Sequence, residues 1–317
     1  MFVRILDKFI SICESKSFLT YHKRPKKMST FKYEIKAKKN STNEKTCILI
    51  QGPIVKKSHF TIETALYYQN IYKNSLIIIS TYPEYLSYLN RHLQHPNIKV
   101  ITSRKIEDHG PSNINLQALT TNAGIQYADI CKKDYILKTR ADQRFYNPET
   151  LNILHNLTEI FKVEGNKANQ KERIIFASQN SFESRVYGPT DTFVFGHISD
   201  IKRYFDIQRV NSNSKFKSRQ KNDLAKNFLP EVYFFSNYLL KTGHKLEWGL
   251  SDYQKVMRER IIFVDSSEID LFWPKYGKKE FRWKRYEDVK NFQEISFNSW
   301  LLNYCQSSTF SRSVINE

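Results

Sequence analysis

The sequence predicts an α/β fold in which a mainly parallel central sheet is flanked by helices. Between residues 46 and 145, short apolar segments alternate with longer segments whose apolar residues recur at helical spacing. This alternation is typical of a parallel sheet with covering helices. The chain has 317 residues, 40% of them hydrophobic, and is long enough to bury a sizeable core. Nine glycines and nine prolines exclude collagen-like and linker-dominated chains.

The first half of the chain predicts four strands separated by three helices. The strands are short, apolar and rich in β-branched residues, and the first ends at a Gly-Pro turn. Parallel strands of this kind bind ligands where their carboxyl ends meet. The expected strands are CILIQGPIV (47–55), SLIIIST (75–81), NIKVITS (97–103) and YILKTRAD (135–142), and the expected helices are 59–74, 83–95 and 114–130.

The second half is less regular, but several elements are still predicted. One helix is expected to begin near Pro230 and to stop at Gly243. The expected strands are RIIFASQ (173–179), TDTFVFG (190–196) and RIIFVD (260–265), and the expected helices are 197–208 and 229–243.

The charge balance favours an anionic partner. The net charge is +18, which suits nucleic acid, a phospholipid surface or a phosphate-bearing substrate. Residues 1–45 hold 12 Lys and Arg against 4 Asp and Glu, a net of +8. The apolar residues at the start of this arm have helical spacing, which fits a helix docked on the core or a helix on a membrane surface. A solvated leader is the third interpretation of the arm.

The sequence predicts neither a transmembrane helix nor a signal peptide. No apolar run approaches about 18 residues, and charged residues interrupt the apolar N-terminus. The cysteines are far apart and lack the spacing of a metal site, as is typical of reduced thiols in a cytoplasm. They are Cys13, Cys47, Cys131 and Cys305.

Three acidic residues stand at places where chemistry is expected. Asp142 closes a predicted strand between Arg140 and Arg144, where it would hold a divalent cation on a diphosphate or form a local salt bridge. Asp191 precedes an apolar strand, where it would deprotonate a hydroxyl or bond a turn. Glu231 opens a helix, a place that the helix dipole explains without any functional role.

Six segments occur in an order that resembles a known family. They are ILIQGPI (48–54), LIIISTY (76–82), NINLQALTTNAGI (113–125), YILKTRAD (135–142), DTFVFG (191–196) and PEVYF (230–234). Over residues 46–280 the chain is similar to the WavE lipopolysaccharide synthesis family of bacterial surface-glycan enzymes. The resemblance implies a GT-A-type glycosyltransferase fold, with a nucleotide-binding half (46–145) and an acceptor half (146–290). Residues 1–45 would then form a basic amphipathic arm and residues 291–317 a C-terminal tail.

The resemblance also implies roles for residues in the matching motifs. The nucleotide-sugar donor would be bordered by Gln51, Gly52 and Pro53, contacted by Asn115 and Gln117, and neutralised at its diphosphate by Lys138, Arg140 or Arg144. Asn115 and Gln117 would otherwise cap or pack a helix end. Asp142 would bind Mn²⁺ or Mg²⁺, but the second acid of the usual D-x-D motif is absent, so a metal-independent mechanism stays open. Asp191 would be the acceptor base if the enzyme inverts.

The predicted function is transfer of a sugar from a nucleotide-sugar to a lipid-linked or glycan intermediate of lipopolysaccharide or capsule. The enzyme would be cytoplasmic and peripheral on the inner face of the cytoplasmic membrane, held there by its basic arm. A nucleotidyl- or phospho-sugar transferase is the alternative, since it would use the same cluster on phosphate. Nucleic acid is not an expected partner, because no helix-turn-helix or zinc pattern accompanies the positive charge.

Overall fold

The computed structural model describes residues 5, 9, 12, 41–93, 95–163, 169–212, 229–273 and 294–305. The chain divides into two compact units, residues 1–34 and 35–317, and the fold below is that of the second unit. The basic stretches KRPKK (23–27) and KAKKN (36–40), and most of the basic, polar stretch NSNSKFKSRQKND (211–223), lie outside the described residues.

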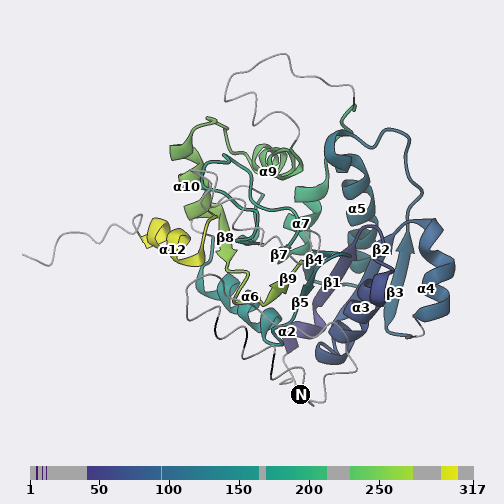
Figure 1. The fold of residues 1–317 in the computed structure, drawn as a ribbon. Helices are drawn as coiled ribbons and strands as arrows, with labels where there is room; N and C mark the ends of the chain where they lie inside the picture. Colours follow the sequence, from purple (N-terminus) through teal and green to yellow (C-terminus); the bar gives the residue numbers. More distant parts are fainter. Residues whose placement is uncertain are drawn as a thin grey trace, which may run out of the picture. The chain divides into compact units, whose positions relative to one another are not determined.

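The described part of the second unit is built on a seven-stranded sheet with strand order β3-β2-β1-β4-β7-β6-β8 (Figure 1). Strand β7 runs antiparallel to both of its neighbours, and every other pair in the sheet is parallel. The predicted mainly parallel α/β fold is therefore confirmed. The strands are β1 (Thr46–Gln51), β2 (Leu76–Thr81), β3 (Ile98–Thr102), β4 (Tyr135–Arg140), β6 (Ile174–Ala177), β7 (Val194–His197) and β8 (Ile261–Val264).

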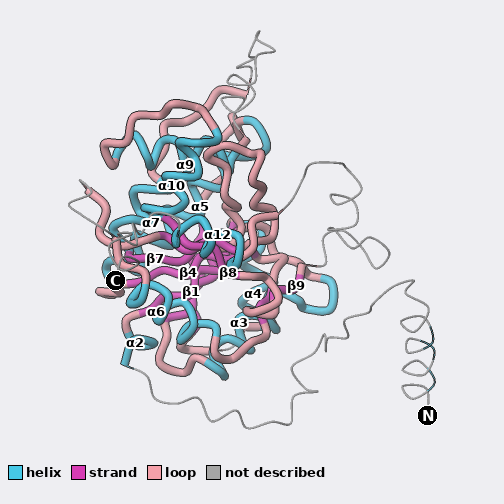
Figure 2. The backbone as a smooth tube through the Cα atoms, turned by 90° about the vertical axis from the view of Figure 1, so that its left-hand side faces the viewer, coloured by secondary structure: helices cyan, strands magenta, loops and turns pink. Residues whose placement is uncertain are grey.

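Helices cover both faces of this sheet. Figures 1 and 2 show α5, α7 and α9 over one face and α3 and α6 over the other. Apart from the partly exposed edge strand β3, the strands between them are mostly buried on both sides, which explains their apolar runs. The helices are α2 (Ser41–Glu44), α3 (Phe60–Ile71), α4 (Leu86–His92), α5 (Ile114–Ile130), α6 (Thr150–Ile160), α7 (Ile198–Phe205), α9 (Pro230–Lys241), α10 (Leu250–Arg260) and α12 (Phe297–Cys305).

Two helices and two short strands of the fold have no counterpart in the sequence predictions. They are α6, α10, and the strands β5 (Arg144–Phe145) and β9 (Leu271–Phe272), which form a small antiparallel sheet. Helix α12 lies inside the predicted C-terminal tail and packs on α10 and β8 through the buried Trp300. Short 3-10 turns at Lys57–His59, Pro83–Tyr85 and Pro111–Asn113 precede α3, α4 and α5.

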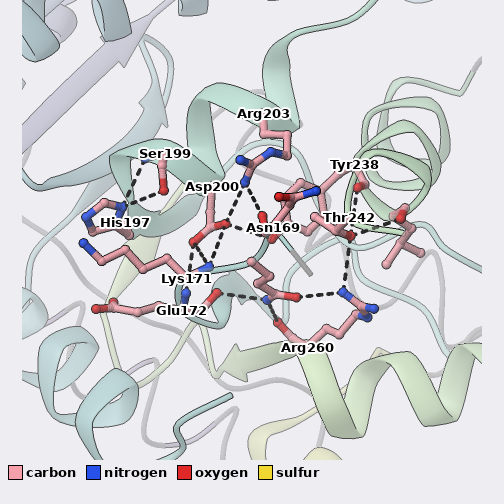
Figure 3. A network of polar contacts seen from close by, with 12 residues as sticks. Asn169, Lys171, Glu172, His197, Ser199, Asp200, Arg203, Tyr238, Thr242 and Arg260 are labelled. Carbon is pink, nitrogen blue, oxygen red and sulfur yellow. Dashed lines mark hydrogen bonds and ion pairs between the residues drawn. The ribbon is translucent and has the colours of Figure 1, made fainter. Parts of the chain in front are cut away.

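A polar network fixes the edge of the sheet where the parallel strands begin (Figure 3). The buried Asp200 of α7 accepts hydrogen bonds from the backbone N–H groups of Lys171 and Glu172 and from the Tyr238 hydroxyl. Burial raises the pKa of Asp200, and these bonds oppose that rise. His197, beside Asp200 in the chain, pairs with Tyr135 at the start of β4. The network therefore supports the fold at the edge opposite to the strand ends.

Candidate active site at the carboxyl edge of the sheet

The polar strand ends converge on one edge of the sheet. In the register of the parallel strands, Gln51 at the end of β1 pairs with Ser80 of β2 and with Arg140 of β4. Because β7 is antiparallel, it starts at this same edge, and its Val194 pairs with Lys138. Asp191, three residues before β7, is therefore brought next to the end of β4. The edge gathers the residues that the sequence placed on separate motifs.

The turn after β1 leaves free space beside its backbone. Gly52 has a φ of +119°, a conformation that favours glycine. Its N–H donates to the Ser80 carbonyl at 3.0 Å, and its own carbonyl accepts from Thr81 Oγ1 at 2.8 Å. A Cβ atom on Gly52 would meet nothing within 4 Å. The turn is thus held rigidly, next to the exposed Pro53, with room for a ligand to approach its backbone.

The side chain of Gln51 points away from this free space. Its Nε2 donates to Thr120 Oγ1 of α5 at 2.8 Å, and the side chain is buried. Its backbone carbonyl accepts from the N–H of Ala141. Gln51 therefore ties the end of β1 to α5 and to the end of β4, and so positions the turn.

A buried cation and a carboxylate form the floor of the site. Lys138 is fully buried, and its Nζ donates to the backbone carbonyl of Asp191 at 2.6 Å. Gln117 Nε2 donates to Asp191 Oδ2 at 2.5 Å. Burial lowers the pKa of Lys138 to about 8, although the negative charges of Asp191, Asp142 and Glu231 oppose the change. The structure thus brings together three predicted site residues from α5, β4 and the segment before β7.

Asp142 and Arg140 form a salt bridge at the rim of the site. Arg140 Nε and Nη2 donate to the two carboxylate oxygens of Asp142 at 2.8 and 3.1 Å. Trp273 Nε1 also donates to Asp142 Oδ2 at 3.0 Å, and the Arg140 guanidinium lies 5.3 Å from the Trp273 ring centroid. The local salt bridge that the sequence offered as an alternative role for Asp142 is therefore present.

The residues around Asp142 do not make up a metal site. Among the described residues no group of three His, Cys, Asp or Glu side chains is placed to hold a metal ion. Asp142 supplies a single carboxylate whose two oxygens both accept from Arg140. A divalent cation normally needs several oxygen ligands, so these residues do not fit the ion that the resemblance implies. The predicted dependence on Mn²⁺ or Mg²⁺ stays a prediction.

Arg144 lies inside the protein, away from the rim where it was predicted. Its fully buried guanidinium donates to Thr64 Oγ1 at 2.8 Å and to the Phe60 carbonyl at 3.0 Å, both in α3. A further bond reaches the Tyr146 hydroxyl at 3.3 Å. Arg144 therefore clamps β5 to α3, and we give it no role on the diphosphate.

Asn115 is also used within the fold. Its Nδ2 donates to the carbonyls of Val210 and Asp108 at 2.7 and 3.0 Å, and its Oδ1 accepts from the Val210 N–H at 2.9 Å. The side chain thus ties the start of α5 to two loops. This is the packing role that the sequence left open for Asn115, and we assign the residue no contact with the donor.

Glu231 and its partners form a third polar group, which the sequence did not mark as a site. Glu231 Oε1 accepts from Asn180 Nδ2 at 2.7 Å and lies 3.6 Å from Arg185 Nη1. Asn180 follows the end of β6, which runs parallel to β8 and ends at the same edge as β4. The Pro230-Glu231 pair marked a helix start in the sequence, but nothing in the sequence marked Asn180 or Arg185 as its partners.

Comparisons with known proteins give a general likeness only. No protein-family model matches the sequence, and no curated protein matches it either. A nucleotide-diphospho-sugar transferase from Desulfovibrio desulfuricans is similar at a TM-score of 0.37 and 11% identity, over 70% of this chain and 80% of that one. A 4-diphosphocytidyl-2C-methyl-D-erythritol synthase from Anaerococcus prevotii is similar at a TM-score of 0.39 and 11% identity, over 84% of this chain and 98% of that one. A cytidylyltransferase from Leptospira borgpetersenii is similar at a TM-score of 0.33 and 13% identity, over 52% of this chain and 66% of that one. These solved structures are of transferases that handle nucleotides, but scores this low carry no argument about this chain.

Proposed function

We propose that this protein is a glycosyltransferase, which moves a sugar from a nucleotide-sugar donor to an intermediate of a bacterial surface polysaccharide. The observation that carries the proposal is the buried Lys138, held by Asp191 at the carboxyl edge of a parallel sheet. Sheets of this kind bind ligands at that edge. The resemblance of the sequence motifs to the WavE family supports a lipopolysaccharide or capsule intermediate as the acceptor.

The site offers the charges that such a transfer needs. When the sugar leaves the donor, negative charge develops on the departing diphosphate, and a cation in a water-poor site stabilises it strongly. Lys138 supplies that cation from the floor, and Arg140 supplies a second at the rim. Gly52 and Pro53 would border the nucleotide, where the turn leaves room. In an inverting transfer a general base accepts the proton of the acceptor hydroxyl, and Asp191 is the candidate predicted from the sequence for that case.

We expect one nucleotide class to bind and stabilise the protein. UDP, GDP, CDP and CMP, each alone and linked to a sugar, are added with and without Mn²⁺, and the melting temperature is measured. A ligand at about 100 times its Kd raises the free energy of unfolding by about 2.7 kcal/mol. A shift of the melting temperature that a nucleotide causes only when Mn²⁺ is present would establish the predicted metal dependence. If only oligonucleotides shift the melting temperature, the transferase proposal is wrong.

The products of turnover separate sugar transfer from the alternative. A glycosyltransferase releases a nucleoside diphosphate or monophosphate from its sugar donor. A nucleotidyltransferase instead consumes a nucleoside triphosphate and a sugar phosphate and releases pyrophosphate. Release of pyrophosphate would replace the proposed reaction with this second one.

The N-terminal arm supports attachment to a membrane surface. Ile5, Phe9 and Ile12 are helical and are exposed by 59%, 64% and 50%. Their spacing places them on one face of a helix, and the surrounding 45 residues carry a net charge of +8. An apolar helical face next to clustered basic residues suits an anionic lipid surface. No helix in the described parts of the chain is long and apolar enough to cross a membrane.

Deleting residues 1–45 is expected to release the protein from anionic vesicles. Each basic residue near such a surface contributes about 1 kcal/mol, so we expect the affinity for phosphatidylglycerol vesicles to fall by at least about 100-fold. Sedimentation with the vesicles measures it, and phosphatidylcholine vesicles are the control for charge. A truncated protein that still sediments with phosphatidylglycerol would show that the anchor lies elsewhere.

A further inference from the structure

Glu231 is a carboxylate of this edge for which the sequence suggested only a helix-dipole role. We propose that Glu231, and not Asp191, accepts the proton of the acceptor hydroxyl, and that Asp191 is a positioning residue for Lys138. The inference rests on the proposed function, since it assigns a residue to that reaction.

The carboxylate of Glu231 is held by one oxygen. Oε1 accepts from Asn180 and faces Arg185. No further bond to this carboxylate occurs among the described residues, so Oε2 is available to a ligand. The side chain is 15% exposed, which keeps it reachable while most of its surroundings are protein. A general base needs this combination, because it must be oriented and still come within about 2.6–3.2 Å of a substrate hydroxyl.

Asp191 is also held through one carboxylate oxygen, but it is more enclosed. Its residue is 4% exposed, and its Oδ2 accepts from Gln117 Nε2 at 2.5 Å. Its backbone carbonyl accepts from the buried Lys138. Asp191 therefore holds the cation in place through its backbone carbonyl, and its negative charge favours the protonated lysine. An acceptor hydroxyl reaches such an enclosed group with more difficulty than it reaches Glu231.

Glu231 also belongs to the same electrostatic neighbourhood as the cation. Its charge acts on Lys138, and both Glu231 and Asp191 act on Tyr204 of α7. Burial raises the pKa of Tyr204 well above its ordinary value, and the two carboxylates raise it further. The Tyr204 hydroxyl is buried and has no hydrogen-bond partner among the described residues. A buried hydroxyl normally has a partner, so Tyr204 is an unsatisfied polar group in the same electrostatic neighbourhood.

The step balances without any further reactant. Glu231 Oε2 takes the proton from the acceptor O–H as that oxygen forms a bond to the anomeric carbon of the sugar. The bond between the anomeric carbon and the phosphate oxygen breaks, and its electron pair leaves with the nucleotide. Lys138 faces the charge that the nucleotide gains, and the proton on Glu231 passes to water after the product departs.

Glu231→Gln is expected to slow turnover by about 10²- to 10⁴-fold, the range for loss of a general base. Glutamine keeps an oxygen for the Asn180 bond, so the loop stays in place. The probe is the nucleotide-linked sugar that gives the thermal shift in the wild-type protein, and the readout is nucleotide release. Asp191→Asn should slow turnover about 10-fold, because its backbone bond to Lys138 persists. Glu159→Gln, at an exposed position of α6, is the matched control and should leave the rate unchanged.

The pH–rate profile distinguishes a base from a structural residue. Turnover of the wild-type protein and of Asp191→Asn should fall on the acid side as the base becomes protonated. The slow residual turnover of Glu231→Gln should lack this fall. A Glu231→Gln protein with normal turnover overturns the assignment of Glu231, and so does one that is slow but keeps the acid fall. If the wild-type protein does not release a nucleotide from any of the sugar donors, the proposed function itself is overturned.

Discussion

Replacing Arg144 with alanine is expected to lower the free energy of unfolding by about 3–5 kcal/mol. The guanidinium is fully buried and donates to Thr64, Phe60 and Tyr146, and it lies 4.6 Å from the Phe60 ring centroid. Alanine would remove these bonds and leave a cavity between β5 and α3. Losses of this size are typical when a large buried side chain or one partner of a buried ionic cluster is removed.

Urea denaturation followed by circular dichroism measures the effect. Arg144→Lys keeps the charge but not the forked geometry that reaches Thr64 and Phe60 together, so an intermediate loss is expected. Arg91→Ala, on the exposed face of α4, is the matched control and should stay within about 0.5 kcal/mol of the wild-type protein. A loss below about 1 kcal/mol for Arg144→Ala would mean that the buried clamp contributes little to stability.

The half of the fold that carries β1 to β4 could be predicted because its signals are local. Strands β1 and β2 are short, mostly buried segments rich in isoleucine, and α5 spans the residues that the sequence predicted, 114–130. A strand buried on both faces between helices requires such a run. The antiparallel direction of β7 has no comparable signal, because a run of four residues contains no pattern that specifies the direction of a strand.

The missed strands are very short, and one of the missed helices is strongly polar. Strands β5 and β9 have two residues each, which is too few for any periodicity. Helix α10 reads LSDYQKVMRER, and most of its residues are polar or charged. Its buried side chains include Tyr253, Val256 and Met257, which is a narrow helical stripe. Such helices depend on tertiary packing more than on a recognisable pattern.

The candidate site shows the same division between local and distant signals. Arg140 and Asp142 are two residues apart, so their salt bridge was one of the two roles considered from the sequence. The bond between Gln117 and Asp191 spans 74 positions, and no spacing in one sequence announces it. The sequence favoured a helix-dipole role for Glu231, because the dipole explains an acid in the first turn of a helix. The partners Asn180 and Arg185, which give this acid its orientation, come from a distant loop.

Replacing Lys138 with methionine is expected to weaken binding of the nucleoside diphosphate by about 10²-fold while the protein stays folded. Methionine fills most of the space of the lysine stem without its charge, and an apolar replacement of a buried ionic group is often tolerated. Each nearby carboxylate keeps another partner: Asp191 keeps Gln117, Asp142 keeps Arg140 and Glu231 keeps Arg185. Arg140 remains at the rim, but the departing diphosphate loses its buried cation, and losing one such group costs about 10²- to 10³-fold.

The pH dependence gives this prediction its sharpest form. Because burial lowers the pKa of Lys138 from 10.5 to about 8, the wild-type protein should lose affinity for the diphosphate as the pH rises above about 8. Lys138→Met should show weak binding with no such fall.

The stability of the folded protein should change with pH in the opposite direction to the affinity. Between pH 8 and 10.5 the unfolded lysine binds a proton that the folded one has lost, so the wild-type protein gains stability with rising pH relative to Lys138→Met. Calorimetric titration with the nucleotide and urea denaturation at matched pH values measure the two trends. Equal affinity and equal pH profiles in both proteins would place the diphosphate away from Lys138.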